Sequence, residues 1–129
     1  MSTLFTKLIQ GKLPCHKLYE DDMFFSFLDI SPISEGHTLL IPKQEVDYFF
    51  DQSHDELSEI LLVSKYIASA LKKAVPCKRV GILVAGLEVP HAHLHLVPIT
   101  HTSQLSFEHA KAEDDKQLQE TAKKIRAHL

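Results

Sequence analysis

The most informative segment of the chain is His91-Ala92-His93-Leu94-His95-Leu96-Val97. Polar and apolar residues alternate along it, which is the two-residue period of a strand with one buried face. On such a strand the three histidines share one face, and neighbours on that face stand about 6.6 Å apart. Histidine titrates near neutral pH, so three of them in strict alternation indicate proton, phosphate or metal chemistry.

Three interpretations of this row differ in their chemistry. The first is a strand with a solvated polar face, on which the histidines have no chemical task. The second is a metal site, in which two of the three bind zinc together with a residue such as His37; the outer pair lie about 13 Å apart and cannot share one ion. The third is a row along a phosphate, in which a neutral imidazole attacks phosphorus while its neighbours donate to the oxygens.

Charge repulsion limits how many of these histidines can be protonated together. Two imidazolium ions about 6.6 Å apart repel each other by about 2.5 kcal/mol at an effective dielectric constant of about 20. We therefore expect mixed protonation, with the middle histidine, His93, neutral near pH 7. Nucleophilic attack on a phosphate requires such a neutral imidazole.

Outward from this stretch, hydrophobic periodicity and turn residues predict the other elements. The expected helices cover residues 4–9, 53–74 and about 113–129, and the expected strands cover residues 17–19, 23–29, 37–41, 79–86 and 91–97. Ser53 and Glu56 form a capping box at the start of the long helix. Short turns join most strands, so the sequence predicts an α+β fold, a five-stranded antiparallel meander with helices on one face.

Composition narrows the class of protein further. The chain has 129 residues, of which 44% are hydrophobic and 24% charged, which fits a single domain over residues 1–129. A net charge of −3 argues against nucleic-acid binding, and no apolar run approaches the roughly 20 residues that span a membrane. Cys15 and Cys77 form no C-x-x-C pair and no secretory leader is expected, so we expect a reducing, cytoplasmic location.

The sequence also resembles a known family. The stretch from His91 to Val97 is similar to the His-φ-His-φ-His-φ-φ motif (φ, apolar) that defines the histidine triad (HIT) family of nucleotide hydrolases and transferases. The similarity covers most of residues 4–98 and is greatest to the histidine triad nucleotide-binding (HINT) branch. The matching stretches are Leu4-Phe5, Lys7-Leu8-Ile9, Gly11, Leu13-Pro14, Tyr19-Glu20-Asp21-Asp22, Phe27-Leu28-Asp29-Ile30-Ser31-Pro32 and Gly36-His37-Thr38-Leu39-Leu40-Ile41-Pro42.

The resemblance implies a role for each matching site residue. His93 would attack the α-phosphate and carry a covalent nucleotidyl group, and His95 would contact the phosphate and the leaving-group side. His91 and His37 would orient and polarise the row, and Asp29 would accept hydrogen bonds from the ribose hydroxyls. The apolar residues of the purine pocket would be Phe5, Leu8, Leu13, Phe27, Leu28, Ile30 and Leu39.

The resemblance further implies a homodimer with the long helix in its interface, and we expect no cofactor. The chain departs from the HINT branch in its phosphate loop. It has no Asn at all, and a compact connection, residues 86–90, replaces a polar loop ending in a Ser or Thr that would help to protonate the leaving group. Thr3 and Thr6 stand where some members have two zinc-binding cysteines, so no structural metal is expected.

These observations predict an enzyme. We expect it to cleave purine nucleoside phosphoramidates or related nucleotide conjugates through a nucleotidyl-His93 intermediate. The missing Asn and hydroxyl keep a second function open, a purine nucleotide-binding regulatory module with weak or vestigial catalysis. A metal-dependent hydrolase that uses the histidine row is the third.

Overall fold

A computed structural model describes residues 2–129 of the chain. Its main elements, in chain order, are α1 (Leu4–Ile9), β1 (Lys17–Glu20), β2 (Phe24–Leu28), β3 (Thr38–Pro42), α2 (His54–Ala74), β4 (Arg79–Leu83), β5 (Leu94–Ile99) and α3 (Asp115–Arg126). Every helix and strand expected from the sequence is present. Among the described residues, no helix is long and apolar enough to cross a membrane.

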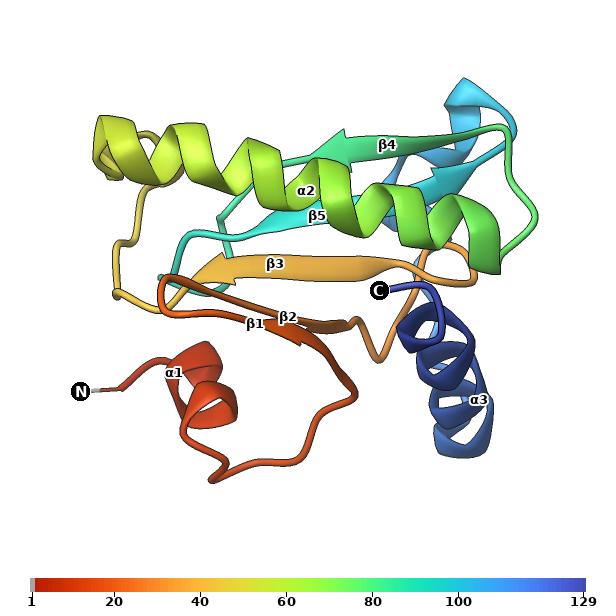
Figure 1. Cartoon of the computed structure of the whole chain (residues 1–129), viewed down its shortest axis with the longest axis horizontal. Helices are drawn as coiled ribbons and strands as arrows, with labels where there is room; N and C mark the ends of the chain where they lie inside the picture. Colours follow the sequence, from red (N-terminus) through yellow and green to blue (C-terminus); the bar gives the residue numbers. More distant parts are fainter. Residues whose placement is uncertain (1) are drawn as a thin grey trace.

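The five strands form one antiparallel sheet in the order β1-β2-β3-β5-β4, which confirms the α+β prediction. The order departs from a simple meander at one point. After β3 the chain enters the long helix α2, which delivers β4 to the outer edge of the sheet, and β5 then returns between β3 and β4 (Figure 1). The return of β5 brings the histidine stretch into the middle of the sheet, next to β3.

One face of the sheet carries the main hydrophobic core. Side chains of β2, β3 and β5 pack there against α2 and α3, and the fully buried members include Phe24, Leu40, Leu94, Ile60, Ile67 and Ile125. Figure 1 shows α2 running along the sheet. The helix α2 begins at the predicted capping box, in which Ser53 Oγ accepts the Glu56 amide N–H at 3.1 Å and the Glu56 carboxylate accepts the Ser53 amide N–H at 3.2 Å. This cap satisfies amide donors that the first turn of a helix otherwise leaves unpaired.

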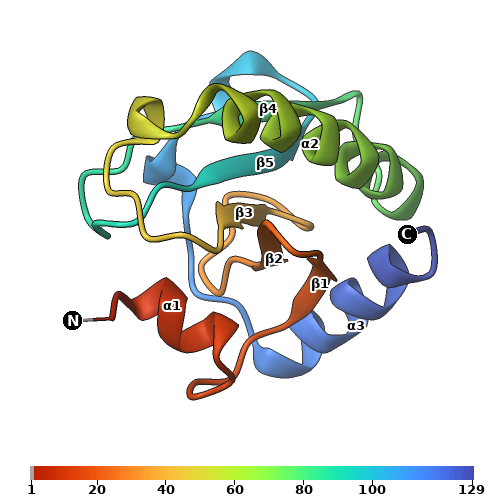
Figure 2. The same cartoon turned by 60° about the vertical axis from the view of Figure 1, so that its left-hand side comes forward.

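The opposite face carries a smaller cluster and the short helix α1. Phe5 of α1 packs there with Phe25 and Phe27 of β2 and with Leu39 and Ile41 of β3. The prediction placed all helices on one face, and α1 departs from it, lying across the sheet from α2 (Figure 2). Because side chains alternate along β5, Leu94 and Leu96 enter the main core while His95 emerges on the α1 face.

The predicted strand over residues 91–97 is displaced by three residues, since β5 begins at Leu94. Pairing between β3 and β5 stops at Leu40 and Leu94. Pro42 has no amide hydrogen for the sheet, and its carbonyl oxygen accepts a hydrogen bond from the His91 ring at 2.7 Å. The His91 side chain thus makes a hydrogen bond to β3 at the point where backbone pairing with β5 has ended.

The segment after β5, residues 100–113, crosses the α1 side of the sheet before α3 begins (Figure 2). It contains the short 3-10 helices Thr102–Gln104 and Phe107–His109. Backbone hydrogen bonds from Lys111 to Pro32 and from Glu113 to Ile30 tie its end to the loop between β2 and β3. The sequence analysis assigned no helix or strand to this segment and did not predict where it lies in the fold.

Candidate active site

Four histidines meet on the α1 face, as the sequence predicted. His37 lies at the start of β3, His91 and His93 precede β5, and His95 lies within it. All four are buried; His93 is 8% exposed and His95 6%. The ring centroids of His93 and His95 lie 5.1 Å apart, and those of His95 and His37 also lie 5.1 Å apart.

His37 is fixed by the loop that precedes it. The amide N–H of Ile33 donates to His37 Nδ1 at 2.9 Å, and a backbone amide can only donate, so Nδ1 carries the lone pair and the ring proton lies on Nε2. Gly36 makes the turn into this position with a φ of +89°, and a Cβ there would lie 3.3 Å from Pro98 and Val75 side-chain atoms. The loop backbone therefore sets the tautomer of His37.

His95 takes its tautomer from His37. Its Nδ1 lies 2.8 Å from His37 Nε2 and accepts that proton, so the proton of His95 itself lies on Nε2. Burial, together with the nearby His37 and His93, lowers the pKa of His95 to about 3. Burial also lowers the pKa of His37, and this effect outweighs the negative charge of Asp29, which raises the pKa. Both rings are therefore neutral at pH 7, and His95 presents an N–H donor.

His93 has the opposite tautomer. Its Nδ1 lies 2.7 Å from the backbone carbonyl oxygen of His91, which can only accept, so the proton lies on Nδ1 and Nε2 carries the lone pair. Phe5 packs edge-on against the ring at a centroid distance of 5.0 Å. Among residues 2–129, Oε1 of Gln52 is the one buried side-chain N or O atom without a partner, so the free Nε2 atoms of His93 and His95 retain access to solvent.

The row thus places Nε2 of His93, whose Nδ1–H is bonded to a carbonyl, beside the N–H of the neutral His95 ring. This is the combination that attack on a phosphate needs, a nucleophile next to a donor for the phosphoryl oxygens. The two rings offer their Nε2 atoms in opposite roles, and the neutrality of His93 near pH 7 stays a prediction.

His91 holds the row in place and has no free nitrogen. Its Nε2–H donates to the Pro42 carbonyl, and its Nδ1 lies 2.8 Å from Oγ1 of Thr3, the N-cap residue of α1. The ring is fully buried, and burial lowers its pKa. In this structure His91 reaches the site through its backbone carbonyl, which orients His93.

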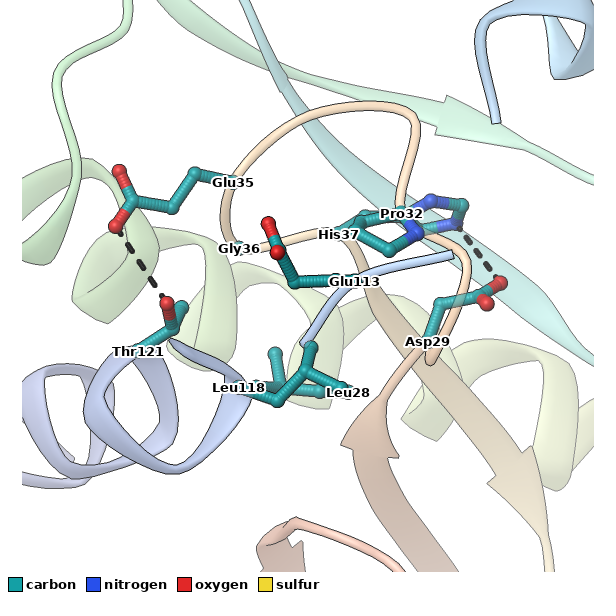
Figure 3. Close-up of a pocket in the computed structure, with 9 residues that line it drawn as sticks. All are labelled: Leu28, Asp29, Pro32, Glu35, Gly36, His37, Glu113, Leu118 and Thr121. Carbon is teal, nitrogen blue, oxygen red and sulfur yellow. Dashed lines mark hydrogen bonds and ion pairs between the residues drawn. The ribbon is translucent and has the colours of Figure 1, made fainter. Parts of the chain in front are cut away.

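Asp29 lies next to His37, and its two carboxylate oxygens have different neighbours. Oδ1 accepts the amide N–H of Ser31 at 2.8 Å, which is the turn bond typical of aspartate, and Oδ2 lies 3.6 Å from His37 Nε2 (Figure 3). The side chain is partly exposed. The hollow beside it, between this loop and α3, is about 10 Å³, enough for one water and too small for a nucleotide.

The predicted purine-pocket residues separate into three groups. Phe5, Phe27 and Leu39 are buried in the cluster next to His93, and Leu8 packs against them. Ile30 is 66% exposed, and Leu13 is also exposed. Leu28 points to the other face, into the main core with Leu118, so its predicted place in the pocket is wrong. The two-residue alternation along β2 is the reason.

Phe107 is a site residue that the sequence reasoning missed. It comes from the crossing segment 100–113, and its ring meets the His95 ring edge-on with centroids 4.8 Å apart. It is partly exposed, so it borders the site on the side of His95. A lone aromatic in a polar stretch was the available signal, and only the tertiary fold connects it to the triad.

A metal fits this cluster poorly. Ligand atoms of Asp29, His37 and His95 all lie within 4.8 Å of one another. A neutral histidine that binds zinc through Nε2 must carry its proton on Nδ1, and on His37 that proton would face the Ile33 amide N–H. The donor set therefore favours the hydrogen-bonded pair of histidines over a metal at this cluster.

The buried neutral histidines should make stability depend on pH. The pKa of His95 is about 3 in the folded protein against an ordinary 6.5, so the unfolded chain binds this proton more readily. Stability is then complete above pH 6.5 and falls as the pH drops towards 3. At pH 5 we expect His95 alone to have cost about 2 kcal/mol of the free energy of unfolding.

Urea unfolding of the wild type and of His95→Asn at pH 7.5 and pH 5 measures this effect. The wild type should lose more stability than the variant over this interval. Equal losses would show that His95 is not held neutral by the fold.

Comparison with known proteins agrees with this geometry. Residues 10–102 match the family model described as the HIT domain, so the chain belongs to the histidine triad family. A Schizosaccharomyces pombe adenosine 5′-monophosphoramidase is 34% identical over 103 aligned positions, covering 76% of this chain and 74% of that protein. An Arabidopsis thaliana adenylylsulfatase of the HINT type is 31% identical over 135 positions, covering 98% of this chain and 68% of that protein.

The fold agreement extends over nearly the whole chain. The crystal structure of a HIT-like protein from Bartonella henselae superposes with a TM-score of 0.87 at 32% identity, covering 99% of this chain and 96% of that one. The match includes the tail beyond the family model, so the crossing segment and α3 have counterparts in that structure. The chain is thus a HIT-family protein related to HINT, a family in which nucleotide hydrolases occur.

Proposed function

We propose that the protein hydrolyses purine nucleotide conjugates, including nucleoside phosphoramidates, at the α-phosphate through a nucleotidyl-His93 intermediate. The observation that carries this proposal is the pair of opposite tautomers, a free Nε2 lone pair on His93 beside a free Nε2–H on His95. The printed names of two relatives, an adenosine 5′-monophosphoramidase and an adenylylsulfatase, support an adenosine 5′-phosphate group as the part to be bound.

The chemistry proceeds in two steps. His93 Nε2 attacks the α-phosphorus, and the bond from phosphorus to the leaving group breaks. The resulting imidazolium keeps its Nδ1 proton on the His91 carbonyl oxygen, which stabilises the positive charge. Water then attacks phosphorus, the phosphorus–nitrogen bond breaks, its electron pair returns to His93, and the proton that the water loses passes to solvent. Splitting one displacement into two in this way is the advantage of covalent catalysis.

A panel of adenylated and guanylated conjugates tests this function. We expect released AMP or GMP, and no loss of activity when a chelator is present, because the histidine pair needs no metal. Absence of nucleotide release from every member would contradict the proposal. Release only after zinc is added would favour the metal-dependent hydrolase instead.

The alternative of a regulatory nucleotide-binding module is supported by the loop before the triad. Residues 86–90 carry no hydroxyl or amide side chain, and Leu87 at the tip is 94% exposed. A single-turnover experiment separates the two functions: an enzyme first releases the leaving group and then the nucleotide, whereas a binding module retains the intact conjugate.

We further propose that two copies associate through the outer side of α2 and the edge strand β4. Large apolar side chains are exposed there, and β4 has an unpaired edge (Figure 1). These side chains are Leu61, Leu62, Tyr66, Ile82 and Val84. The molar mass in solution at micromolar concentration tests this arrangement, with Leu62→Glu as the variant expected to give a monomer.

A further inference from the structure

His93 depends on a single peptide group for its orientation. Its Nδ1–H donates to the His91 carbonyl oxygen at 2.7 Å, which is the one hydrogen bond that its ring makes within residues 2–129. The N–H of the same peptide group, that of Ala92, donates to the Val46 carbonyl oxygen at 2.6 Å. A shift of this peptide group would turn the attacking nitrogen of His93 away from the phosphate, and a misplacement of about 1 Å can slow a reaction about 100-fold.

The side chain of His91 holds that peptide group from a second direction. Its Nε2–H donates to the Pro42 carbonyl oxygen at 2.7 Å, and burial lowers the pKa of the ring and keeps it neutral. A neutral ring with its proton on Nε2 has only a lone pair on Nδ1. The Thr3 hydroxyl, 2.8 Å away, must therefore donate its proton to this nitrogen. Thr3 is thus bonded to the ring of the residue whose carbonyl orients the nucleophile.

The Thr3 hydroxyl is itself fixed by the start of α1. Its oxygen accepts the Thr6 amide N–H at 3.1 Å, as the N-cap of that helix. Glu45, in the loop after β3, accepts the Thr6 hydroxyl and also the Thr3 amide N–H, the latter at 2.8 Å. These hydrogen bonds lower the pKa of Glu45, so its carboxylate is ionised at neutral pH. A chain of directed hydrogen bonds therefore connects Glu45 through Thr3 to His91.

The loop after β3, residues 42–46, joins these contacts into one unit. It supplies the Pro42 carbonyl to the His91 ring, the Val46 carbonyl to the Ala92 amide, and the carboxylate of Glu45 to the start of α1. The helix α1 in turn packs Phe5 edge-on against the rings of His91 and His93, with centroids 5.7 and 5.0 Å away. The position of α1 and the position of the nucleophile are therefore linked.

We propose that Thr3 and Glu45 are positioning residues of the active site, which act on the nucleophile His93 through the ring and the backbone carbonyl of His91. The inference rests on the proposed nucleotidyl-His93 chemistry and names residues that set the rate of its first step. The hydroxyl of Thr3 is used by His91 and by the Thr6 amide, so neither residue has to touch the substrate. The two residues should therefore affect the attack on phosphorus and leave nucleotide binding unchanged.

Thr3→Val and Thr3→Ser test the hydroxyl, because valine keeps the shape of threonine and serine keeps its hydroxyl. The substrate is the adenylated conjugate that the wild type cleaves fastest. Thr3→Val should lower kcat about 10- to 100-fold, with KM close to the wild-type value. Thr3→Ser should restore most of the rate. A Thr3→Val protein with the wild-type kcat, or a loss that Thr3→Ser does not restore, would overturn the inference.

Nitrogen-15 NMR of the histidine rings gives a readout that does not depend on turnover. The Nδ1–H proton of His93 should exchange with water faster in Thr3→Val than in the wild type or in Thr3→Ser, because the His91 carbonyl is held less firmly. An inactive Thr3→Val protein with an unchanged His93 resonance would contradict the inference, because the loss would then come from α1 alone. If the wild type releases AMP from no conjugate, the proposed function fails, and the resonance alone decides whether Thr3 positions the ring.

Glu45→Ala decides the question if Thr3→Val does not fold, because Glu45 lies on the surface. It should change kcat and the His93 resonance in the same direction as Thr3→Val, but by less, because water can accept the exposed donors. Glu56→Ala is the matched control, since Glu56 accepts the amide N–H of Ser53, the N-cap of α2, as Glu45 accepts that of Thr3. The control should leave both readouts unchanged. Equal effects of the two glutamate variants would refute a positioning role for Glu45.

Discussion

His93→Ala should lower the rate of nucleotide release by at least about 10³-fold, as expected when an essential nucleophile is removed. His93 holds the one free imidazole lone pair along the row, because its Nδ1 proton is bound to the His91 carbonyl and His95 offers an N–H instead. A neighbour cannot replace it: His91 has both nitrogens bonded, and His37 has both engaged. Nucleotide affinity should stay within about tenfold, since the base and ribose contacts that we propose are made by other residues.

Covalent labelling tests directly whether His93 is the nucleophile. A substrate labelled at the α-phosphate should leave acid-labile, base-stable label on the wild type and none on His93→Ala. His128→Ala is the matched control, because His128 is exposed near the end of the chain. Label that maps to another histidine, or a His93→Ala protein that keeps most of its turnover, would overturn the assignment of the nucleophile.

Local patterns were sufficient to predict the elements and the gathering of the histidines. The alternation along residues 91–97 reports which side chains share a face, and the Ser53–Glu56 capping box reports where a helix begins. Both are properties of neighbouring residues, so they are readable without a structure. The same alternation rule, applied along β2, would have shown that Leu28 and Phe27 cannot both line one pocket.

The remaining features depend on contacts between distant parts of the chain. The tautomers of the row are set by the Ile33 amide and the His91 carbonyl, which are backbone groups with no signature in the sequence. The start of β5 is set by His91 bonding to Pro42, forty-nine positions earlier. Phe107 reaches His95 only because the segment after β5 crosses the sheet. Each of these three features shapes the site, and none of them is marked by a pattern among neighbouring residues of the sequence.

A substitution of Asp29 can distinguish its predicted role as a ribose contact from a purely structural role in the turn. Asp29→Asn keeps an oxygen for the Ser31 amide N–H but replaces the acceptor Oδ2 with an amide donor. If ribose hydroxyls donate to Oδ2, this variant should weaken nucleotide binding by about 1.5–3 kcal/mol, the usual contribution of hydrogen bonds to charged groups. That corresponds to a roughly 10- to 150-fold higher Kd.

The ligand serves as the internal control for this variant. A 2′,3′-dideoxy nucleotide has no hydroxyls to donate, so its Kd should change much less between the wild type and Asp29→Asn. Titration calorimetry with both ligands on both proteins completes a cycle that isolates the hydroxyl contact from any effect on the loop. If both ligands lose the same affinity, Asp29 acts through the turn and its 3.6 Å approach to His37, and the ribose must be held by other groups.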